Sequence, residues 1–309
     1  MIGLRKSKFH EWQKRLGLSN HHNGAAPKTH WLTPDEVDAV IAFAKEHVSN
    51  NVFFLKDGYR RIAYTMIDRN IVAASPSSVY RILKKAGLLN RWNTKVSPAK
   101  GKGFKQPGAP HKHWHIDIKY VSFHGSFFFL ISIIDGYSRF IVHHELCASM
   151  THDDVQLTIR KAKELFPHTK PRIISDNGSQ FIAKEFKAFI AELGLTHVRT
   201  SVNYPQSNGK IERFHRTIAE ECLKRKAAVS IADLRNILSH YIHYYNTERL
   251  HAAIYYLTPV DRLNGLTDHI LAVREEKLAA AERSRAAYWE SHNLYDVPPY
   301  FFVPKSVFC

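Results

Sequence analysis

The segment between residues 113 and 147 limits the possible folds of this chain more than any other part of it. It consists of three apolar stretches separated by His124-Gly125 and by Asp135-Gly136. Pairs of this kind between strand-forming stretches are typical of tight hairpin turns. The segment therefore predicts three antiparallel strands in sequence order, a β-meander. The first stretch, HWHIDIKYVSF, carries Asp117 in its middle, where a carboxylate needs a compensating cation or several hydrogen bonds.

The sequence after the meander alternates between helical and strand patterns. A capping box from Thr151 to Asp154 begins a helix, and a short apolar strand at 172–175 ends just before Asp176. The next elements are a helix at about 183–193, a strand at 195–200 and a helix that begins at Lys210. The order βββαβαβα predicts an α/β fold, a mixed five-stranded sheet with helices packed on its faces.

Only helices are predicted before residue 93. Apolar residues at i, i+3 and i+7 predict a helix in the first 20 residues. The run Thr33–Glu36 has the N-cap, proline and acidic residues of a helix start, and that helix should reach about His47. Two shorter helices, at 59–69 and 76–86, are joined by a tight turn.

The helix at 76–86 has a basic face, because Arg81, Lys84 and Lys85 point away from its apolar side. Such a face suits a recognition helix in a DNA groove, and a solvated face on a structural helix is the alternative. The segment 93–112 has five lysines, three prolines and three glycines without periodicity, which predicts a flexible linker. Its lysines would contact phosphates without reading sequence, and we name Lys100, Lys102 and Lys105.

The charge of the chain favours a polyanionic partner. Lys and Arg total 44 against 28 Asp and Glu, a formal net charge of +16. The excess is concentrated in residues 1–112, which hold 20 basic and 7 acidic residues. Nucleic acid is therefore the leading partner class, bound mainly by the first part of the chain.

Cysteine content and hydropathy exclude several classes. The three cysteines lack the spacing of a zinc site or a disulfide framework. The longest apolar run, Phe127 to Ile134, is far shorter than the roughly 20 residues that span a bilayer. The first residues contain no apolar signal core. We therefore expect a soluble protein of the cytoplasm, with no membrane partner.

Three acids are placed where they could carry chemistry. Asp117 lies in the first strand, Asp176 follows the fourth, and Glu212 lies in the first turn of the helix after the fifth. If the first and fourth strands are neighbours, the three acids meet at one edge of the sheet. Divalent Mg²⁺ would relieve their repulsion, and two such ions would serve an in-line phosphoryl displacement.

Each acid also has a structural interpretation. Asp176 begins a sequence typical of a turn, and Glu212 with Arg216 could be a surface pair on a helix. Asp135 is explained by its hairpin turn and is not a candidate member of the site. His115, two residues before Asp117 on the same strand face, fits a packing role or a role beside a ligand better than metal ligation.

These motifs resemble one known family, the integrase-like DDE transposases of bacterial insertion sequences, which are relatives of retroviral integrases with a ribonuclease H-like fold. The resemblance rests on HWHIDIKYV, SDNGSQF and NYPQSNGKIERFHRT, and 35 residues lie between Asp176 and Glu212, as in that family. It also rests on YNTERLH, in which Leu250 replaces the usual proline, and on GYRRI and VYRIL upstream, which look like the family's helix-turn-helix.

The resemblance implies an enzyme that cleaves and joins DNA strands at the ends of a mobile element. Asp117, Asp176 and Glu212 would bind two Mg²⁺ ions, for which Mn²⁺ substitutes, and water or a DNA 3′-hydroxyl would be the nucleophile. Four residues would shape the turns that present the acids, namely Asn177, Gly178, Asn208 and Gly209. Lys210 and Arg213, expected on the solvent side of their helix, would hold DNA phosphates.

The resemblance also implies partners and a domain order. The partners are double-stranded DNA, further copies of the chain, and a DNA-binding protein from an overlapping upstream frame. In a bacterium the protein would associate with the nucleoid when bound to DNA. The expected order is a partial helix-turn-helix at 1–20, a helical DNA-binding region at 21–92, a basic linker at 93–112, a catalytic core at 113–226, a helical post-core segment at 227–266 and a helical and aromatic tail at 267–309.

Two other functions stay open at this point. A metal-dependent nuclease with the same fold would share the three acids but release its products without joining strands. A DNA-binding regulator with an inactive core would bind DNA and need no acids. Retention of all three carboxylates disfavours the regulator, and the helix-turn-helix and post-core motifs disfavour a simple nuclease.

Overall fold

The computed structural model describes most of the chain and divides it into two compact units. The larger unit is Ala39–Leu278, and the other comprises Met1–Asp38 and Ala279–Cys309. The described residues are 9, 10, 13, 30–50, 58–89, 106–200 and 208–292. The predictions outside them are most of the helix at 1–20, most of the linker with Lys100, Lys102 and Lys105, and the end of the tail.

Within the described residues, three of the helices predicted before the sheet are present. α2 (Pro34–Asn50) begins with a reciprocal cap, in which Thr33 N donates to Glu36 Oε2 at 2.9 Å and Glu36 N donates to Thr33 Oγ1 at 3.3 Å. α3 (Tyr59–Asp68) and α4 (Pro76–Lys85) form a helix pair. Their buried side chains are Ile62, Ala63, Thr65, Met66, Ile67, Val79 and Leu83. The predicted helix-turn-helix geometry thus has a small apolar core of its own.

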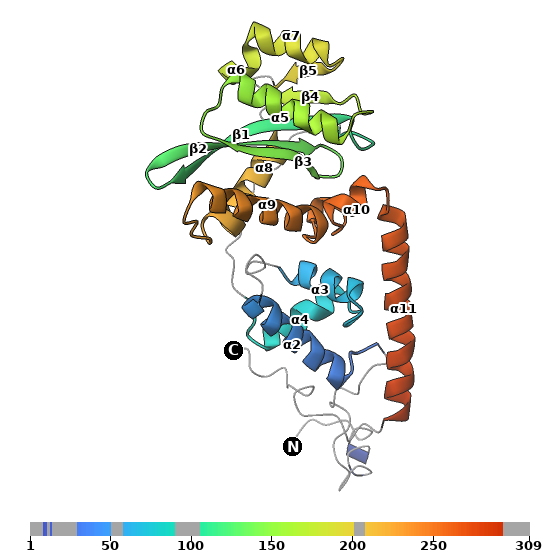
Figure 1. Ribbon diagram of the computed structural model, residues 1–309. Coiled ribbons are helices and arrows are strands. Elements are labelled where there is room, and N and C mark those ends of the chain that lie inside the picture. Colours follow the sequence, from blue (N-terminus) through green and yellow to red (C-terminus); the bar gives the residue numbers. More distant parts are fainter. Residues whose placement is uncertain are drawn as a thin grey trace. The chain divides into compact units, whose positions relative to one another are not determined.

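Five strands form one mixed sheet in the order β3-β2-β1-β4-β5 (Figure 1). β1 (His113–Phe123), β2 (Ser126–Asp135) and β3 (Ile141–Cys147) are the predicted antiparallel meander. β4 (Arg172–Ser175) and β5 (Thr196–Arg199) run parallel to β1. This order and these directions are those of the ribonuclease H-like fold, so the predicted fold class is confirmed.

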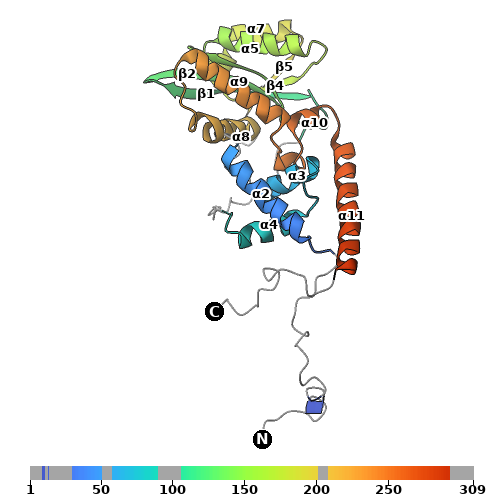
Figure 2. The same cartoon turned by 60° about the horizontal axis from the view of Figure 1, so that its bottom comes forward.

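Helices cover both faces of the sheet (Figure 1 and Figure 2). α5 (His152–Leu165), α6 (Ser179–Ile182) and α7 (Lys184–Glu192) enclose one core, and α8 (Gly209–Ile218) and α9 (Ile231–Thr247) enclose the other. The first core includes Trp114, Ile116, Val155, Ile159, Phe181 and Phe186. The second includes Val121, Leu130, Ile211, Phe214, Leu238 and Tyr241. Because side chains alternate along a strand, the odd-numbered residues of β1 lie on the α8 side.

The post-core helices follow with one departure from expectation. α8 continues into a π-helical turn, η2 (Ala219–Leu223), which the sequence pattern did not predict. After α9 come η3 (Ala252–Ile254), α10 (Pro259–Leu263) and α11 (Thr267–Ser291), and the last two agree with the predicted helices. Ser230 and Thr258 cap α9 and α10, because each accepts a hydrogen bond from the backbone N–H three residues later.

The connection between β2 and β3 is longer than the predicted tight turn. β2 ends at Asp135 and β3 begins only at Ile141. The Asp135 carboxylate accepts hydrogen bonds from Tyr137 N and Ser138 N, which folds the intervening residues around it. The connection between β2 and β3 is therefore shaped by hydrogen bonds to the Asp135 side chain and not by a two-residue hairpin turn.

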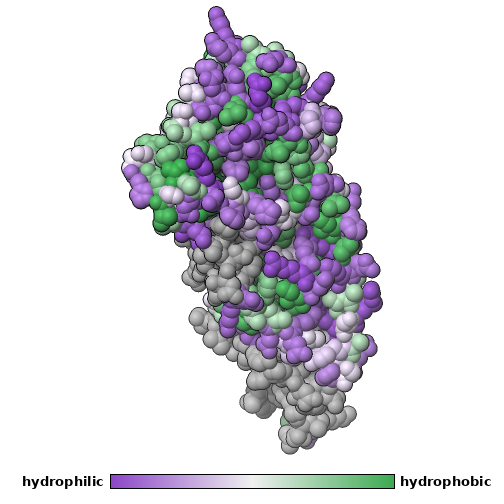
Figure 3. All heavy atoms as spheres, viewed as in Figure 1, coloured by the Kyte–Doolittle hydropathy of each residue, from purple (hydrophilic) through white to green (hydrophobic). Residues whose placement is uncertain are grey.

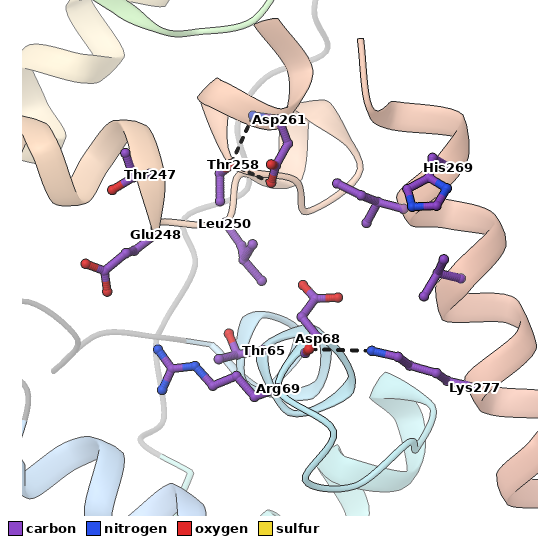
Figure 4. A pocket seen from close by; sticks show the side chains of 12 residues that line it. Thr65, Asp68, Arg69, Thr247, Glu248, Leu250, Thr258, Asp261, His269 and Lys277 are labelled. Atoms are coloured by element: carbon purple, nitrogen blue, oxygen red, sulfur yellow. Dashed lines mark hydrogen bonds between the residues drawn. The ribbon is translucent and has the colours of Figure 1, made fainter. Parts of the chain in front are cut away.

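α3 is attached to the helices that follow the core. Arg274 of α11 forms a two-pronged ion pair with Asp68, at 2.7 and 2.6 Å, and Lys277 Nζ donates to the carbonyl of Ile67 at 2.9 Å. A pocket of about 430 Å³ lies between α3 and the segment from α9 to α11 (Figure 4). Polar side chains from these helices line it, among them Glu248.

The smaller unit is held by two contacts of its own. Arg285 forms an ion pair with Glu36 at 2.8 Å. The indole of Trp289 donates to the carbonyl of Trp31 at 2.8 Å. The start of α2 and the end of α11 are therefore side by side within this unit.

The surface mixes hydrophilic and hydrophobic residues (Figure 3). Hydrophobic residues gather at the outer end of the β1–β2 hairpin, where Phe127 is 61% exposed and Tyr120 is 56% exposed. Within the described part of the chain, no helix combines the length and the hydropathy that crossing a membrane requires.

Candidate active site

The register of β1 against β4 directs two of the predicted carboxylates toward the same end of the strand pair. His115 of β1 pairs with Ile174 of β4. Continuing this register by two residues sets Asp117 opposite Asp176, and neighbouring strands lie about 4.8 Å apart. The predicted adjacency of the first and fourth strands is confirmed.

Glu212 joins the two aspartates from α8, which packs against β1 and β2. Asp117, Glu212 and His215 line one open groove of about 610 Å³ between β1 and the helix formed by α8 and η2. Partial burial raises the pKa of Glu212, and the negative charges of Asp117 and Asp176 raise it further, while His215 opposes them. The three acids therefore interact electrostatically, as the sequence predicted for a clustered site.

The contacts of the two aspartates come mainly from the backbone next to them. Asp117 Oδ1 accepts a hydrogen bond from Ile118 N at 2.9 Å, and its Oδ2 lies 3.3 Å from His215 Nδ1. Asp176 Oδ1 accepts a hydrogen bond from Gly178 N at 2.9 Å. Among the described residues, no lysine or arginine forms an ion pair with Asp117, Asp176 or Glu212. Within the described residues, the negative charge of the group is thus left without a lysine or arginine partner.

This donor set fits a divalent metal by its chemistry. Carboxylate oxygens are hard ligands of the kind that Mg²⁺ prefers, and a cation would remove the repulsion that raises the pKa of Glu212. In the described ranges, no group of three or more His, Cys, Asp or Glu residues is arranged closely enough to hold an ion as it stands. Metal binding at these acids is therefore a proposal.

The predicted supporting residues contact the ends of the strands rather than the acids alone. Asn177 Nδ2 donates to the carbonyl of Thr200 at 3.0 Å, which ties the end of β4 to the end of β5. Gly178 has a φ of −56°, so it is not required for a left-handed turn, and it contributes its N–H to Asp176. Both residues hold the turn that presents Asp176.

Asn208 and Gly209 lie at the start of α8, the helix that presents Glu212. Asn208 occupies the N-cap position, but its side chain makes no cap hydrogen bond. Its carbonyl accepts from Ile211 N and Glu212 N instead, at 3.1 and 3.2 Å. A Cβ at Gly209 would meet no atom within 4 Å, so the fold itself does not require glycine there.

Lys210 does not lie on the solvent side of α8, which corrects the prediction. Lys210 comes one turn before the buried Phe214 and lies on the same side of the helix. Its Nζ is therefore buried, and it has no hydrogen-bond partner among the described residues. Burial and the charge of Arg139 lower the pKa of Lys210 to about 7, against the opposing effect of Asp135. Arg213 is exposed, as predicted.

Asp135 and His115 have the structural surroundings that the sequence suggested. Asp135 is fully buried, and its carboxylate accepts from His111 N, Tyr137 N, Ser138 N and Ser138 Oγ. His115 is also fully buried, and burial lowers its pKa to about 3, so its ring is neutral. Neither side chain is a member of the carboxylate group.

Several groove residues were missed as site residues from the sequence. Lys119 follows Asp117 on β1, and Arg216 and Lys224 follow Glu212 along α8 and η2, so that all three line the groove. The sequence pattern indicated Arg216 only as a helix-surface partner for Glu212. The sequence signal that could have found them is spacing: residues two apart on a strand, or four apart on a helix, lie on the same side of that element. Which strand faces which helix decides whether such residues meet.

The basic residues of α4 have the predicted exposure. Arg81, Lys84 and Lys85 are exposed, whereas Val79 and Leu83 are buried. Their binding to DNA stays a prediction.

The YNTERLH sequence forms contacts within the protein. Asn246 accepts from Ile141 N at 2.8 Å and donates to Ile141 O at 3.0 Å, which pairs the free edge of β3. Arg249 forms a two-pronged ion pair with Glu221 of η2, at 2.7 and 2.9 Å, and Tyr241 Oη donates to the same carboxylate at 2.8 Å. The motif thus joins the sheet edge to the continuation of the helix that carries Glu212.

Comparisons with known proteins point to one family. Two family models, both described as integrase core domain, match residues 107–205 and residues 193–259. The inferred integrase ORF3 of Spiroplasma virus SpV1-C74 is 31% identical over 45% of this chain and 43% of its own length. The inferred transposase InsK of insertion sequence IS150 from Escherichia coli (strain K12) is 25% identical over 50% of this chain and 55% of its own length. The chain thus spans about half the length of these two relatives.

A further relative covers more of the chain. The transposase of insertion sequence element IS904 from Lactococcus lactis subsp. lactis (strain IL1403) is 25% identical over 67% of this chain and 87% of its own length. Among solved structures, the simian T-cell lymphotropic virus intasome matches with a TM-score of 0.44 and 16% identity over 71% of this chain and 73% of that chain. The family models and the sequence relatives together support an integrase-like transposase of an insertion sequence, and the matches to an integrase core domain lie within residues 107–259.

Proposed function

We propose that the chain is a transposase that cleaves DNA strands at the ends of an insertion sequence and joins them to target DNA. The observation that carries the proposal is the convergence of Asp117, Asp176 and Glu212 on one side of the sheet, without a lysine or arginine partner among the described residues. The integrase core match over these positions and the transposase relatives support the same activity.

Asp117, Asp176 and Glu212 would hold two divalent ions, Mg²⁺ or Mn²⁺. Bound there, two ions would activate a nucleophilic oxygen and stabilise the leaving oxygen in an in-line phosphoryl displacement. The protein's part is to present the three carboxylates from two rigid strands and one helix. The turn at Gly178 fixes Asp176, and the packing of α8 against β1 and β2 fixes Glu212.

The groove would hold the DNA strand that reacts. Lys119, Arg216 and Lys224 line the groove that also contains Asp117 and Glu212. Lysine and arginine side chains bind the phosphates of a DNA strand without reading its bases. In this groove they would hold a phosphate next to the carboxylates. Arg213 is exposed on α8 and would add to this contact.

The first part of the chain would bind the ends of the element. Arg81, Lys84 and Lys85 form the exposed face of α4, the second helix of the helix pair. Lys100, Lys102 and Lys105 would add affinity that does not depend on sequence and falls with salt. Two ends must be paired before joining, so the active form would contain several copies of the chain, and an upstream-frame DNA-binding protein would complete end recognition.

Two alternatives remain distinguishable by their products. A nuclease of the same fold would cleave without joining, and a regulator with an inactive core would bind without chemistry. The uncompensated carboxylate group disfavours the regulator, because a core that served only DNA binding would gain from replacing it.

The test is strand cleavage and joining by purified protein in Mg²⁺, on DNA that carries the inverted repeats flanking the gene. Asp117→Asn, Asp176→Asn and Glu212→Gln should each abolish both reactions and leave DNA affinity unchanged, because an amide removes the metal-binding charge but keeps the shape. Glu185→Gln is the matched control, since Glu185 is an exposed acid in the first turn of another helix, α7.

Joined products from wild type and Glu185→Gln only would support the transposase. Cleavage without joining would favour the nuclease. DNA binding without cleavage or joining in every protein, wild type included, would contradict activity of this chain on its own. The assay would then be repeated with the upstream-frame protein added: restored activity would indicate a missing partner, and continued inactivity would indicate an inactive core. Equal loss of binding and cleavage in the three variants would contradict their assignment as metal ligands.

A further inference from the structure

Helix α8 brings a fourth side chain to the carboxylate group. His215 lies three residues after Glu212, so both side chains project from the same side of the helix. His215 Nδ1 is 3.3 Å from Asp117 Oδ2, across the interface between α8 and β1. One rigid element therefore carries Glu212 and also contacts Asp117.

The burial of His215 is costly for a purely structural residue. Its side chain is 8% exposed, and its Nε2 is buried without a hydrogen-bond partner among the described residues. An unsatisfied buried polar atom costs about 1–3 kcal/mol. The neighbouring buried positions of α8 are Ile211, Phe214 and Ile218, so an apolar side chain at position 215 would continue the same core at lower cost. The imidazole is thus better explained by its contact with Asp117 than by packing.

The two oxygens of Asp117 have different neighbours. Oδ1 accepts from Ile118 N, which belongs to the same strand, and Oδ2 faces His215. Each oxygen of the carboxylate thus has one polar neighbour, and these neighbours come from two different elements. Without His215, Oδ2 would have no contact from the described residues of another element.

We infer that His215 is a positioning residue that sets the orientation of the Asp117 carboxylate and keeps it in register with Glu212. This inference rests on the proposed function, because it assigns His215 a part in the same metal-binding group. His215 would act through Asp117 and would not contact the reacting atoms. The same contact would transmit any shift of α8 to both carboxylates together.

The test measures binding of Mn²⁺ alone to the full chain by electron paramagnetic resonance, beside Mg²⁺-dependent strand cleavage. His215→Ala should weaken Mn²⁺ binding by about 10–100-fold, the usual effect of removing a residue that orients a metal ligand. Cleavage should then need correspondingly more Mg²⁺. His215→Asn keeps a polar side chain near Asp117 and should restore part of the affinity. His240→Ala is the control, because His240 is exposed on α9.

Thermal unfolding without metal separates positioning from a structural role. Unchanged Mn²⁺ affinity in both His215→Ala and His215→Asn would overturn the inference, whatever their stability. Should His215→Ala not fold, the comparison of His215→Asn with wild type decides. Asp117→Asn separates failure of the metal site from failure of the positioning role. If Asp117→Asn also leaves Mn²⁺ binding intact, the proposed metal site itself fails. If Asp117→Asn loses Mn²⁺ binding but both His215 variants bind Mn²⁺ normally, only the positioning role of His215 is refuted.

Discussion

At the scale of single residues, two aspartates on neighbouring strands, Asp117 of β1 and Asp135 of β2, differ in burial and in hydrogen bonding. Asp135 is fully buried and accepts four hydrogen bonds, whereas Asp117 is partly exposed in a groove with one backbone donor and one histidine nearby. A carboxylate that the fold fully satisfies stabilises the fold, and one left unsatisfied is available to a ligand. The two residues therefore should respond differently to the same substitution.

Asp135→Asn should destabilise the protein by about 2–5 kcal/mol, because an amide cannot accept all four hydrogen bonds and leaves buried donors unpaired. Asp117→Asn should change stability by less than about 1 kcal/mol. Urea unfolding of both variants beside wild type measures the difference. Equal stability of the two variants would show that Asp135 is not the structural residue of the pair.

Glu212 should make stability depend on pH in metal-free buffer. Its raised pKa means that the folded state binds the proton more tightly than the unfolded chain, so stability falls as pH rises from the ordinary glutamate pKa through the raised one. Glu212→Gln should lose this dependence and gain at most about 1 kcal/mol above that range, because the side chain is largely exposed.

Thermal unfolding of wild type and Glu212→Gln between pH 4 and 8, roughly the range around glutamate titration, measures the effect. Mg²⁺ should remove the difference at the upper end of this range by compensating the ionised group. Identical pH profiles of the two proteins would contradict the repulsion between Glu212 and the aspartates.

At the scale of elements, the join between α8 and η2 depends on one buried carboxylate. Burial alone would raise the pKa of Glu221, but the hydrogen bonds and charge of Arg249, with a contribution from Arg61 of α3, lower it below its ordinary value. Arg61 is itself held at a pKa of about 10, mainly by burial and by Arg249. Two arginines from different parts of the larger unit thus share Glu221, next to the helix that carries Glu212.

Removal of either partner from this pair should be strongly destabilising. Arg249→Met should cost about 3–5 kcal/mol, because it leaves the buried Glu221 without its main partner. Glu221→Gln should cost at least as much, since two guanidinium groups then lose their compensating charge. The double variant Glu221→Gln/Arg249→Met should cost less than the sum, and denaturant unfolding of the four proteins as a double-mutant cycle measures the coupling. Additive effects would argue against the pair.

The basic face of α4 gives a prediction about salt dependence. DNA affinity decreases with salt, and the steepness of a plot of log affinity against log salt concentration decreases by about 0.9 for every phosphate that the protein no longer neutralises. Replacing Arg81, Lys84 and Lys85 by glutamine should therefore reduce the slope for DNA binding in proportion to the phosphates they neutralise. Lys184→Gln/Lys187→Gln, on the exposed side of α7, is the control. Fluorescence anisotropy at several salt concentrations measures both, and an unchanged slope in the α4 variant would remove α4 from the DNA interface.

At the scale of the whole molecule, the larger unit connects the helix pair, the sheet and the post-core helices. Asp68 of α3 pairs with Arg274 of α11, and Asn246 of α9 pairs with Ile141 of β3. The YNTERLH sequence therefore contributes to the catalytic core through internal contacts. The proposed function at this scale, the joining of paired DNA ends, would depend on how copies of the chain meet on DNA.

The sequence by itself determined most of the helices and strands and named the three candidate acids. The meander, the N-caps at Ser75, Thr151 and Ser230, and the helix that begins near Lys210 follow from local patterns, because turn residues, caps and apolar periodicity act over a few residues. Asp117 stood out for the same local reason, as a charge inside an apolar strand.

Only the tertiary structure decided which side chains meet. The sequence placed Lys210 on the solvent side of α8, yet its ammonium is buried, and the groove with Lys119, Arg216 and Lys224 forms where β1 faces α8 and η2. The contact of His215 with Asp117 likewise joins residues 98 positions apart in the numbering. Periodicity gives the side of an element on which a residue lies, but the partner across that side is set by the order of the strands and the packing of the helices on the sheet.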